Sequence, residues 1–362
     1  MTDHPSTHGE ARSSPLKSLM KWVGIVAAVL SLIAGVRQVL TLTGESAERE
    51  RRIGELLATG AAQQSAKDYP QAWMSFETAL TQAEQGNLLA KLTRRLGERR
   101  RQVRVAQEDL AMQWLESIAV PPGQTFASIV DKVLPVLHRG VLEGSGARAG
   151  DLYAHVGWGY FLKRRDGPSS LDPAPWYVKA LEADSANPYA HAFSGHWKMW
   201  NHEPLDAAMG EFAAAIASNR ERAFVRGLQV AALVNRGSAD ARLELVKAAN
   251  DVRKNDEPMD GRMRRELRVI YHLALNDKPF TQRLITALPV TEQLATIEMV
   301  TAGPSSAAGS DDSLSVATAL LEEAGGEPAR AVKTWRAVRA NQSESDSPLA
   351  RRADAAIKRL AR

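Results

Sequence analysis

The chain has 362 residues, which is enough for one large domain or two ordinary ones. Its 44% hydrophobic and 24% charged residues are typical of a folded globular protein, and a net charge of +4 is too small to indicate nucleic-acid binding by itself. Because cysteine is absent, disulfides, cysteine nucleophiles and cysteine-ligated zinc are excluded.

The N-terminal region joins a polar tail to one apolar run. Residues 1–18 are polar and are predicted to be disordered. Residues 22–36 carry no charge and lie between Lys21 and Arg37. A helix of this length reaches about 22 Å, short of a ~30 Å hydrocarbon core, but basic side chains at its ends can extend to the headgroups. We therefore expect residues 19–42 to form a retained transmembrane anchor. A cleaved signal peptide and a buried soluble helix are the alternatives.

The charges that flank this run give two nearly equal counts. Arg12, Lys17, Lys21 and the terminal amine precede it, and the residues that follow it are Arg37, Arg49, Arg51 and Arg52. The positive-inside rule therefore does not separate the two orientations. Because a short polar tail is easily left behind on the cytoplasmic side, we expect a single-pass protein of the cell (inner) membrane with its large domain outside the cytoplasm. A cytoplasmic domain is the alternative. Ala27, Ser31 and Gly35 recur at four residues, and this stripe would permit a homodimer through the anchor.

From residue 45 onward the apolar residues follow the helical period. The pattern predicts a hairpin plus a long helix over 45–120, a helical repeat domain over 124–302, and a terminal hairpin with a capping helix over 314–362. Residues 143–150 are rich in glycine and are predicted to be a loop. A low-complexity linker is expected over 303–313, and Pro289 should interrupt the helical stretch over 279–300.

A duplicated phrase is the strongest signal in the chain. Tyr153-Ala154-His155 is followed by Gly159, and Tyr189-Ala190-His191 is followed by Gly195. The two copies are offset by 36 residues. A repeat of this period indicates stacked helical hairpins, in which each unit buries its apolar face against its neighbours.

A second pattern is a small residue in one helix followed by small, aromatic and small residues in the next. The full pattern occurs at Gly60, Ala72, Phe76 and Ala79, and again at Gly195, Ala208, Phe212 and Ala215. Ala331, Trp335 and Val338 repeat the second helix alone, and the unit around Gly159 and Trp176 carries an insertion over 165–175. These residues resemble the tetratricopeptide repeat (TPR) family. The resemblance implies an all-α, TPR-like helical-hairpin repeat solenoid, here with one N-terminal transmembrane helix, and the chain is similar to membrane-tethered bacterial TPR proteins.

The resemblance also implies a partner-binding groove lined by the first helices of successive hairpins. Carried over by position, its residues are Tyr153, Tyr160, Lys163, Arg164, Tyr189, His196, Met199 and Trp200. Aromatic and basic side chains together suit an extended acidic or C-terminal peptide. The alternative is that these residues only pack helices.

The predicted function is a membrane-anchored scaffold or adaptor for a protein or peptide partner. The alternatives are a regulatory or sensor subunit of a larger envelope or defence complex, and a helical enzyme without recognisable motifs.

Other candidate sites have simpler explanations. His155, His191, His196 and His202 suggest a metal, but no acidic residue completes a ligand spacing, so neither a metal nor a cofactor is expected. The basic run over 91–104 is predicted to be a solvated helix face, with anionic lipid and nucleic acid as alternatives. No aromatic residue interrupts the run, so we expect no nucleic-acid partner. No catalytic motif occurs, and the chain is predicted not to be an enzyme.

Overall fold

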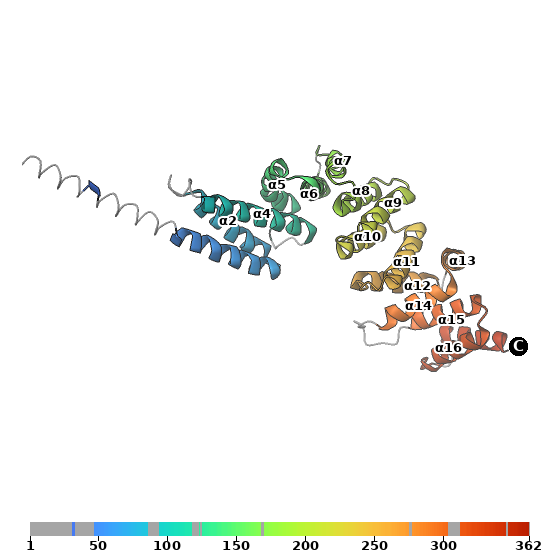
Figure 1. The fold of residues 1–362 in the computed structure, drawn as a ribbon. Helices are drawn as coiled ribbons and strands as arrows, with labels where there is room; N and C mark the ends of the chain where they lie inside the picture. The colour runs from blue at the N-terminus through green and yellow to red at the C-terminus, as the bar shows by residue number, and fades with distance from the viewer. Residues whose placement is uncertain are drawn as a thin grey trace, which may run out of the picture. The chain divides into compact units, whose positions relative to one another are not determined.

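The computed structural model describes residues 31–32, 47–85, 94–117, 123, 125–167, 170–274, 277–302, 312–344 and 347–361. These residues form helices and no strand, which confirms the all-α prediction (Figure 1). The chain divides into two compact units: unit 1 ends at Glu143 and unit 2 begins at Gly144. The domain limits proposed from the sequence stay predictions.

The anchor expected over 19–42 lies outside the described residues, apart from 31–32. The tail over 1–18 and most of the linker over 303–313 also lie outside them. Within the described ranges, no helix combines the length and the apolar composition that a membrane crossing requires.

The described residues of unit 1 form two helical hairpins. The first pairs the helix over residues 47–65 with α2 (Tyr69–Glu84), and the second pairs α4 (Arg94–Ser117) with α5 (Phe126–Glu143). The α2 helix starts where Asp68 caps it, because its side chain accepts a hydrogen bond from the Gln71 backbone. Both α2 and α5 pack against α4.

The first hairpin shows the contact that the small–aromatic–small pattern predicts. Ala72, Phe76 and Ala79 are buried on α2. A Cβ added at Gly60 would lie 2.3 Å from Phe76 Cε1, which is closer than any real side chain tolerates. Only glycine therefore lets the Phe76 ring seat against the backbone of the first helix.

Unit 2 continues with further helices. In chain order they are α6 (Gly146–Asp166), α7 (Ala174–Ala183), α8 (Pro188–Trp200), α9 (Leu205–Ala217), α10 (Arg222–Arg236), α11 (Ala239–Lys254), α12 (Gly261–Ala274), α13 (Lys278–Ala287), α14 (Val290–Ala302), α15 (Asp312–Ala324), α16 (Pro328–Ala340) and α17 (Pro348–Leu360). The break at Pro289 is confirmed, since it separates α13 from α14. The α6–α7 and α8–α9 hairpins adjoin, and α8 packs against both α6 and α10 (Figure 1).

The α8–α9 hairpin repeats the close glycine contact of unit 1. A Cβ at Gly195 would lie 3.1 Å from both the Ala208 carbonyl oxygen and the Phe212 ring. In the α6–α7 hairpin the contacting glycine is Gly157, whose added Cβ would lie 2.6 Å from Tyr177 Cε1. Gly157 lies two residues before Gly159, the glycine that the duplicated phrase predicts for this contact. We attribute this shift to the long connection between α6 and α7.

A ladder of polar groups joins the hairpins of unit 2 at positions 36 residues apart. Asn187 Nδ2 donates to Asp151 Oδ1 at 2.7 Å, a separation of 36 residues. Arg220 donates to Asp184 at 3.0 Å, again 36 residues away, and to Asp151 at 3.1 Å. Asn187 also caps α8, because its Oδ1 accepts from the Ala190 backbone at 2.9 Å. Asn187 therefore both begins α8 and ties it to α6 of the preceding hairpin.

The C-terminal helices form a small core of their own. Trp335 on α16 is buried with Ala331, Val338 and Ala353. The α16 helix packs against α15 on one side and α17 on the other. The spacing that predicted a hairpin here is confirmed, with α17 covering its end.

The loop predicted over 143–150 is wrong from residue 146 onward, because α6 already begins at Gly146. Gly150 lies inside the helix, where an added Cβ would be 2.9 Å from Asn187 Nδ2 and 3.0 Å from Asp184 Cβ. This glycine therefore allows the start of α8 to approach α6, and it does not mark a turn.

We expect Gly60→Ala to lower the free energy of unfolding of unit 1 by about 1–3 kcal/mol, because the added methyl group overlaps the Phe76 ring. Hydrogen exchange of the α2 backbone amides measures this unit separately. The control is Gly54→Ala on the same helix, where an added Cβ has nothing within 4 Å. That change should be neutral or stabilise by about 0.5–1 kcal/mol. Equal α2 protection in both variants would contradict the contact.

Candidate functional site

Aromatic rings fill the contact between α6, α8 and α10. Trp158 stacks on Phe193, with centroids 4.6 Å apart and planes 8° apart. Tyr189 lies 4.5 Å from the His155 ring and 5.5 Å from the Phe224 ring. Tyr189, one of the predicted groove residues, therefore packs between three helices. Its removal would disturb the fold as well as any groove.

The predicted residues of α6 lie in two places. The Tyr153 and Tyr160 rings contact Trp176 of α7, with centroids 6.1 and 5.6 Å away. Arg164 is exposed and its guanidinium lies 5.4 Å from the Trp197 ring of α8. Lys163 is half-buried in the last turn of α6. The two tyrosines thus belong to the packing of their own hairpin, and Arg164 extends toward the next one.

A cavity of about 410 Å³ lies between the C-terminal ends of α8 and α10. We call it the α8–α10 pocket. Its lining residues are His196, Met199, Trp200, His202, Ala232, Asn235 and Arg236. His196, Met199 and Trp200 belong to the predicted groove, whereas His202, Ala232, Asn235 and Arg236 do not.

The 36-residue offset of the repeat predicts the lining residues on α10. Adding 36 to 196, 199 and 200 gives 232, 235 and 236, which are the lining positions on α10. Equivalent turns of two successive first helices therefore form the two walls. The predicted groove ends at α8 because residues 219–310 lack the small–aromatic–small pattern.

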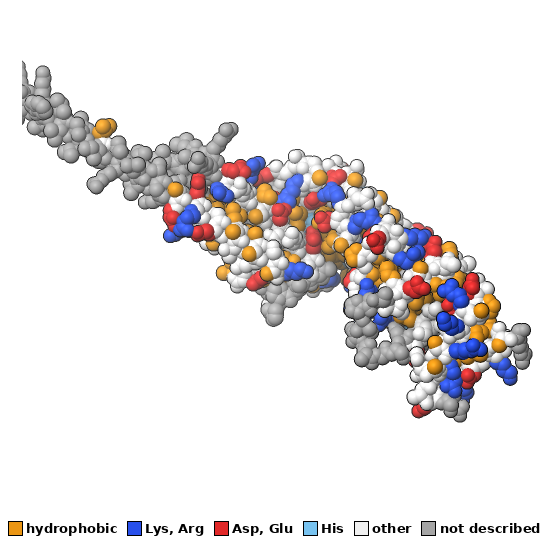
Figure 2. Space-filling view, turned by 60° about the horizontal axis from the view of Figure 1, so that its bottom comes forward, with side chains coloured by type: hydrophobic (Ala, Val, Ile, Leu, Met, Phe, Trp, Pro, Cys, Tyr) orange, Lys and Arg blue, Asp and Glu red, His pale blue; other side chains and the backbone are white. Residues whose placement is uncertain are grey.

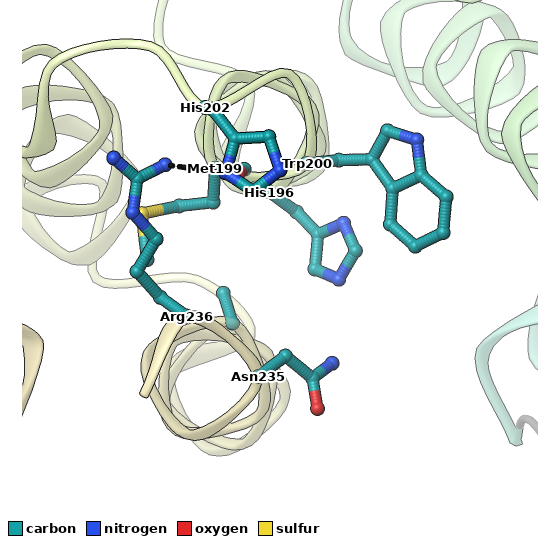
Figure 3. Close-up of a pocket in the computed structure, with 7 residues that line it drawn as sticks. His196, Met199, Trp200, His202, Asn235 and Arg236 are labelled. Carbon is teal, nitrogen blue, oxygen red and sulfur yellow. Dashed lines mark hydrogen bonds between the residues drawn. The ribbon is translucent and has the colours of Figure 1, made fainter. Parts of the chain in front are cut away.

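His196 forms the deepest polar part of the pocket. It is only 7% exposed, and its ring contacts Trp158 and Phe161 at 5.3 and 4.9 Å. Burial, with the nearby charge of Arg165, lowers the pKa of His196 to about 4, so the imidazole is neutral near pH 7. Its Nδ1 is buried and has no hydrogen-bond partner among the described residues. Figure 3 shows the ring extending from α8 toward Asn235.

Arg236 supplies the positive charge of the pocket. Its Nη1 donates to the Met199 carbonyl oxygen at 3.4 Å and lies 3.4 Å from His202 Nδ1 (Figure 3). No carboxylate of the described chain pairs with this guanidinium. Trp200 stands at the rim, 45% exposed, with Phe161 behind it at 5.3 Å. The pocket thus combines an available cation, a neutral imidazole and an exposed indole.

Glu211 of α9 forms a charged triad with Lys198 and His191 of α8. Glu211 accepts from Lys198 Nζ at 2.6 Å and lies 2.7 Å from His191 Nδ1. His191 Nε2 lies 3.1 Å from the Ser185 carbonyl oxygen, so both ring nitrogens face acceptors. The hydrogen bond to Glu211 raises the pKa of His191, and the same contact lowers the pKa of Glu211 to about 2. The contacts of Glu211 with His191 and Lys198 therefore hold α9 against α8.

The four histidines do not gather around one point. His155 Nδ1 lies 2.7 Å from the Asp151 carbonyl oxygen inside α6, whereas His191 faces Glu211 on α9. Within the described ranges, no group of three or more His, Cys, Asp or Glu side chains could hold a metal ion.

The basic run on α4 is a mixed surface. Arg101 pairs with Glu98 at 2.9 Å, and Arg104 pairs with Glu143 of α5 at 2.9 Å. Figure 2 likewise shows both signs of charge interspersed over the face it presents. The run therefore acts in part through ion pairs within unit 1.

No protein-family model and no curated protein matches this sequence. Among solved structures, the chain is similar to a tetratricopeptide repeat protein from Parabacteroides merdae, at 12% identity over 86% of this chain and 100% of that one, with a TM-score of 0.37. It is also similar to Nro1, a nuclear import adaptor (11% identity, 87% and 93% coverage, TM-score 0.33), and to the P58(IPK) TPR domain (12%, 85% and 98%, 0.17). The TPR-like character rests on the hairpin contacts described above. At these scores the neighbours tell us nothing about a partner.

The triad predicts a pH-dependent stability. Because the pKa of His191 is raised above its ordinary value of 6.5, its contribution is full below about pH 6.5 and is lost as the pH rises through the folded-state pKa. We expect the stability advantage of the wild type over His191→Gln to be larger at pH 6 than at pH 8.5, as measured by hydrogen exchange in α8 and α9. In a Glu211→Gln background this pH dependence should disappear. If it persists there, the triad is not its source.

Proposed function

We propose that the protein is a non-catalytic interaction scaffold that holds a segment of a partner protein in the α8–α10 pocket. The observation that carries the proposal is the exposed Trp200 beside a cavity of about 410 Å³ whose guanidinium, Arg236, has no acidic partner in the described chain. Tryptophan and arginine are the side chains that most often dominate protein–protein binding energy.

The chemistry of the pocket favours an acidic segment that also carries an apolar side chain. Met199 and Ala232 are buried lining residues and offer an apolar surface. Arg236 suits a carboxylate, because its planar fork can donate two hydrogen bonds to one carboxyl group. The neutral His196 can donate one hydrogen bond and accept another. An apolar group in the cavity and a carboxylate at its edge would satisfy all four residues.

The proposal includes the N-terminal anchor. Residues 22–36 are the longest uncharged run of the chain, and Lys21 and Arg37 flank it. We infer that residues 19–42 tether the protein to the inner membrane, with the helical units outside the cytoplasm. Tethering raises the local concentration of the scaffold for partners at the same membrane.

Replacing Trp200 by Ala together with Arg236 by Gln should weaken partner capture about tenfold or more without unfolding unit 2, because both side chains lie at the pocket's rim. The assay places a photo-crosslinking residue at Asn235 in the full chain and quantifies the crosslinked partner. Val178→Ala, at a 56% exposed position on α7 away from the pocket, is the matched control. Undiminished crosslinking in the double variant would move the site elsewhere.

The anchor predicts that the full chain stays in the membrane pellet after carbonate extraction. Two arginines in the run, Val29→Arg and Leu30→Arg, should release it, because each charge at the centre of a helix costs about 2.5–3.5 kcal/mol of insertion. A reporter fused to the C-terminus gives the sidedness. Wild-type protein that is washed off by carbonate would rule out the anchor.

A further inference from the structure

Unit 1 contains a second hollow that is independent of the α8–α10 pocket. It has a volume of about 640 Å³ and lies where α2 and α5 both pack on α4. Trp73, Gln107 and Val136 are its buried lining residues. All of the others are exposed or half-buried: Met74, Glu77, Thr78, Leu80, Thr81, Gln82, Glu84, Lys132, Pro135 and Arg139. We call this hollow the α2–α5 groove.

The two sides of this groove carry opposite charges. The α2 side presents Glu77 and Glu84, seven residues apart, and the α5 side presents Lys132 and Arg139, also seven residues apart. Seven residues of helix span about 10 Å, so an acidic row and a basic row of equal length line the same hollow.

These four charges are not neutralised by the described chain. None of them forms an ion pair there, whereas Arg51, Arg101 and Arg104 of the same unit all pair with glutamates. Lys132 lies 5.9 Å from the Trp114 ring, and Arg139 Nη2 donates only to Gln107 Oε1, at 3.4 Å. Ionic partners are therefore still available on both sides.

We propose that the α2–α5 groove seats an amphipathic helix of a partner protein. The partner's apolar stripe covers Trp73, Leu80 and Val136, its basic side chains meet α2, and its acidic side chains meet α5. A helix satisfies its own backbone hydrogen bonds, which suits walls made of helices that offer no free backbone groups. Met74, 57% exposed, supplies a flexible side chain that adapts to the partner's surface.

The mixed charge also excludes other classes of partner. An anionic membrane surface or a nucleic acid has a net negative charge and would be repelled by Glu77 and Glu84. An extended strand would find no sheet edge, because the described residues contain no strand. A helix that carries both signs complements both rows.

The test uses three labelled helical peptides of about 18 residues with the same leucine stripe. The first flanks the stripe with Lys on one side and Glu on the other, the second with Glu on both sides, and the third with Lys on both. Fluorescence anisotropy with the full chain should show the mixed peptide binding about tenfold tighter than either single-sign peptide. In Glu77→Lys/Glu84→Lys both walls are basic, so the preference should change to the all-Glu peptide.

Two further variants separate the groove from general surface charge. Glu55→Lys/Glu98→Lys changes two exposed glutamates of unit 1 outside the groove and should leave the preference unchanged. Thr81→Trp fills the groove and should weaken the mixed peptide about tenfold while the helical circular dichroism is retained. The proposal is overturned if no peptide binds, or if the ranking is the same in Glu77→Lys/Glu84→Lys. It is also overturned if the wild type sediments as a dimer that this variant dissociates, since the occupant is then a second copy.

Discussion

The packing of this protein depends on aromatic rings that lie directly against helix backbone. Gly60 with Phe76, Gly157 with Tyr177 and Gly195 with Phe212 are three cases of the same contact, and in each a Cβ on the glycine would lie about 3 Å or less from the ring. The ring sets how closely the two helices of a hairpin approach. Because each hairpin has only two helices, its other apolar faces must be covered by the neighbouring hairpins. The contact between glycine and ring therefore sets the distance between the two helices of a hairpin, and the contacts between hairpins depend on that distance.

This regular packing explains why residues at equivalent positions of successive hairpins lie next to each other. Asp151 with Asn187 and Asp184 with Arg220 are each 36 residues apart and hydrogen-bonded. The α8–α10 pocket follows the same rule, since its walls are the same turn of two successive first helices. In one place the equivalent positions are hydrogen-bonded polar groups, as at Asp151 and Asn187. At the C-terminal ends of α8 and α10 they leave the α8–α10 pocket, because Trp200 turns outward and Ala232 is small.

The sequence predicts those features that depend on neighbouring residues in the chain. The first hairpin follows from Gly60 and Phe76, and the break at Pro289 follows from proline chemistry. Side-chain surroundings in α6 do not follow, because Trp176 occupies the face where Tyr153 and Tyr160 were expected to be open. The duplicated Tyr-Ala-His phrase lies on the first helix of each hairpin but has different contacts in the two copies: His155 is enclosed by rings and His191 pairs with Glu211. Gly150 misled the helix prediction, since a glycine that admits Asn187 looks the same in sequence as one that ends a helix.

Charged side chains that stabilise the fold are paired, whereas those around the two hollows are unpaired within the described chain. Where charges hold the repeat together they are matched, as in the Arg220 ladder and the Glu211 triad. Around the two hollows the charges are unmatched within the described chain: Arg236 alone in one, and a glutamate row facing a basic row in the other. The hollows also differ in kind, since one lies between successive first helices and the other between successive second helices. A partner that satisfies the cation and indole of the α8–α10 pocket leaves the acidic row of the α2–α5 groove unpaired. The two hollows therefore differ in the chemistry of the ligands that we propose for them.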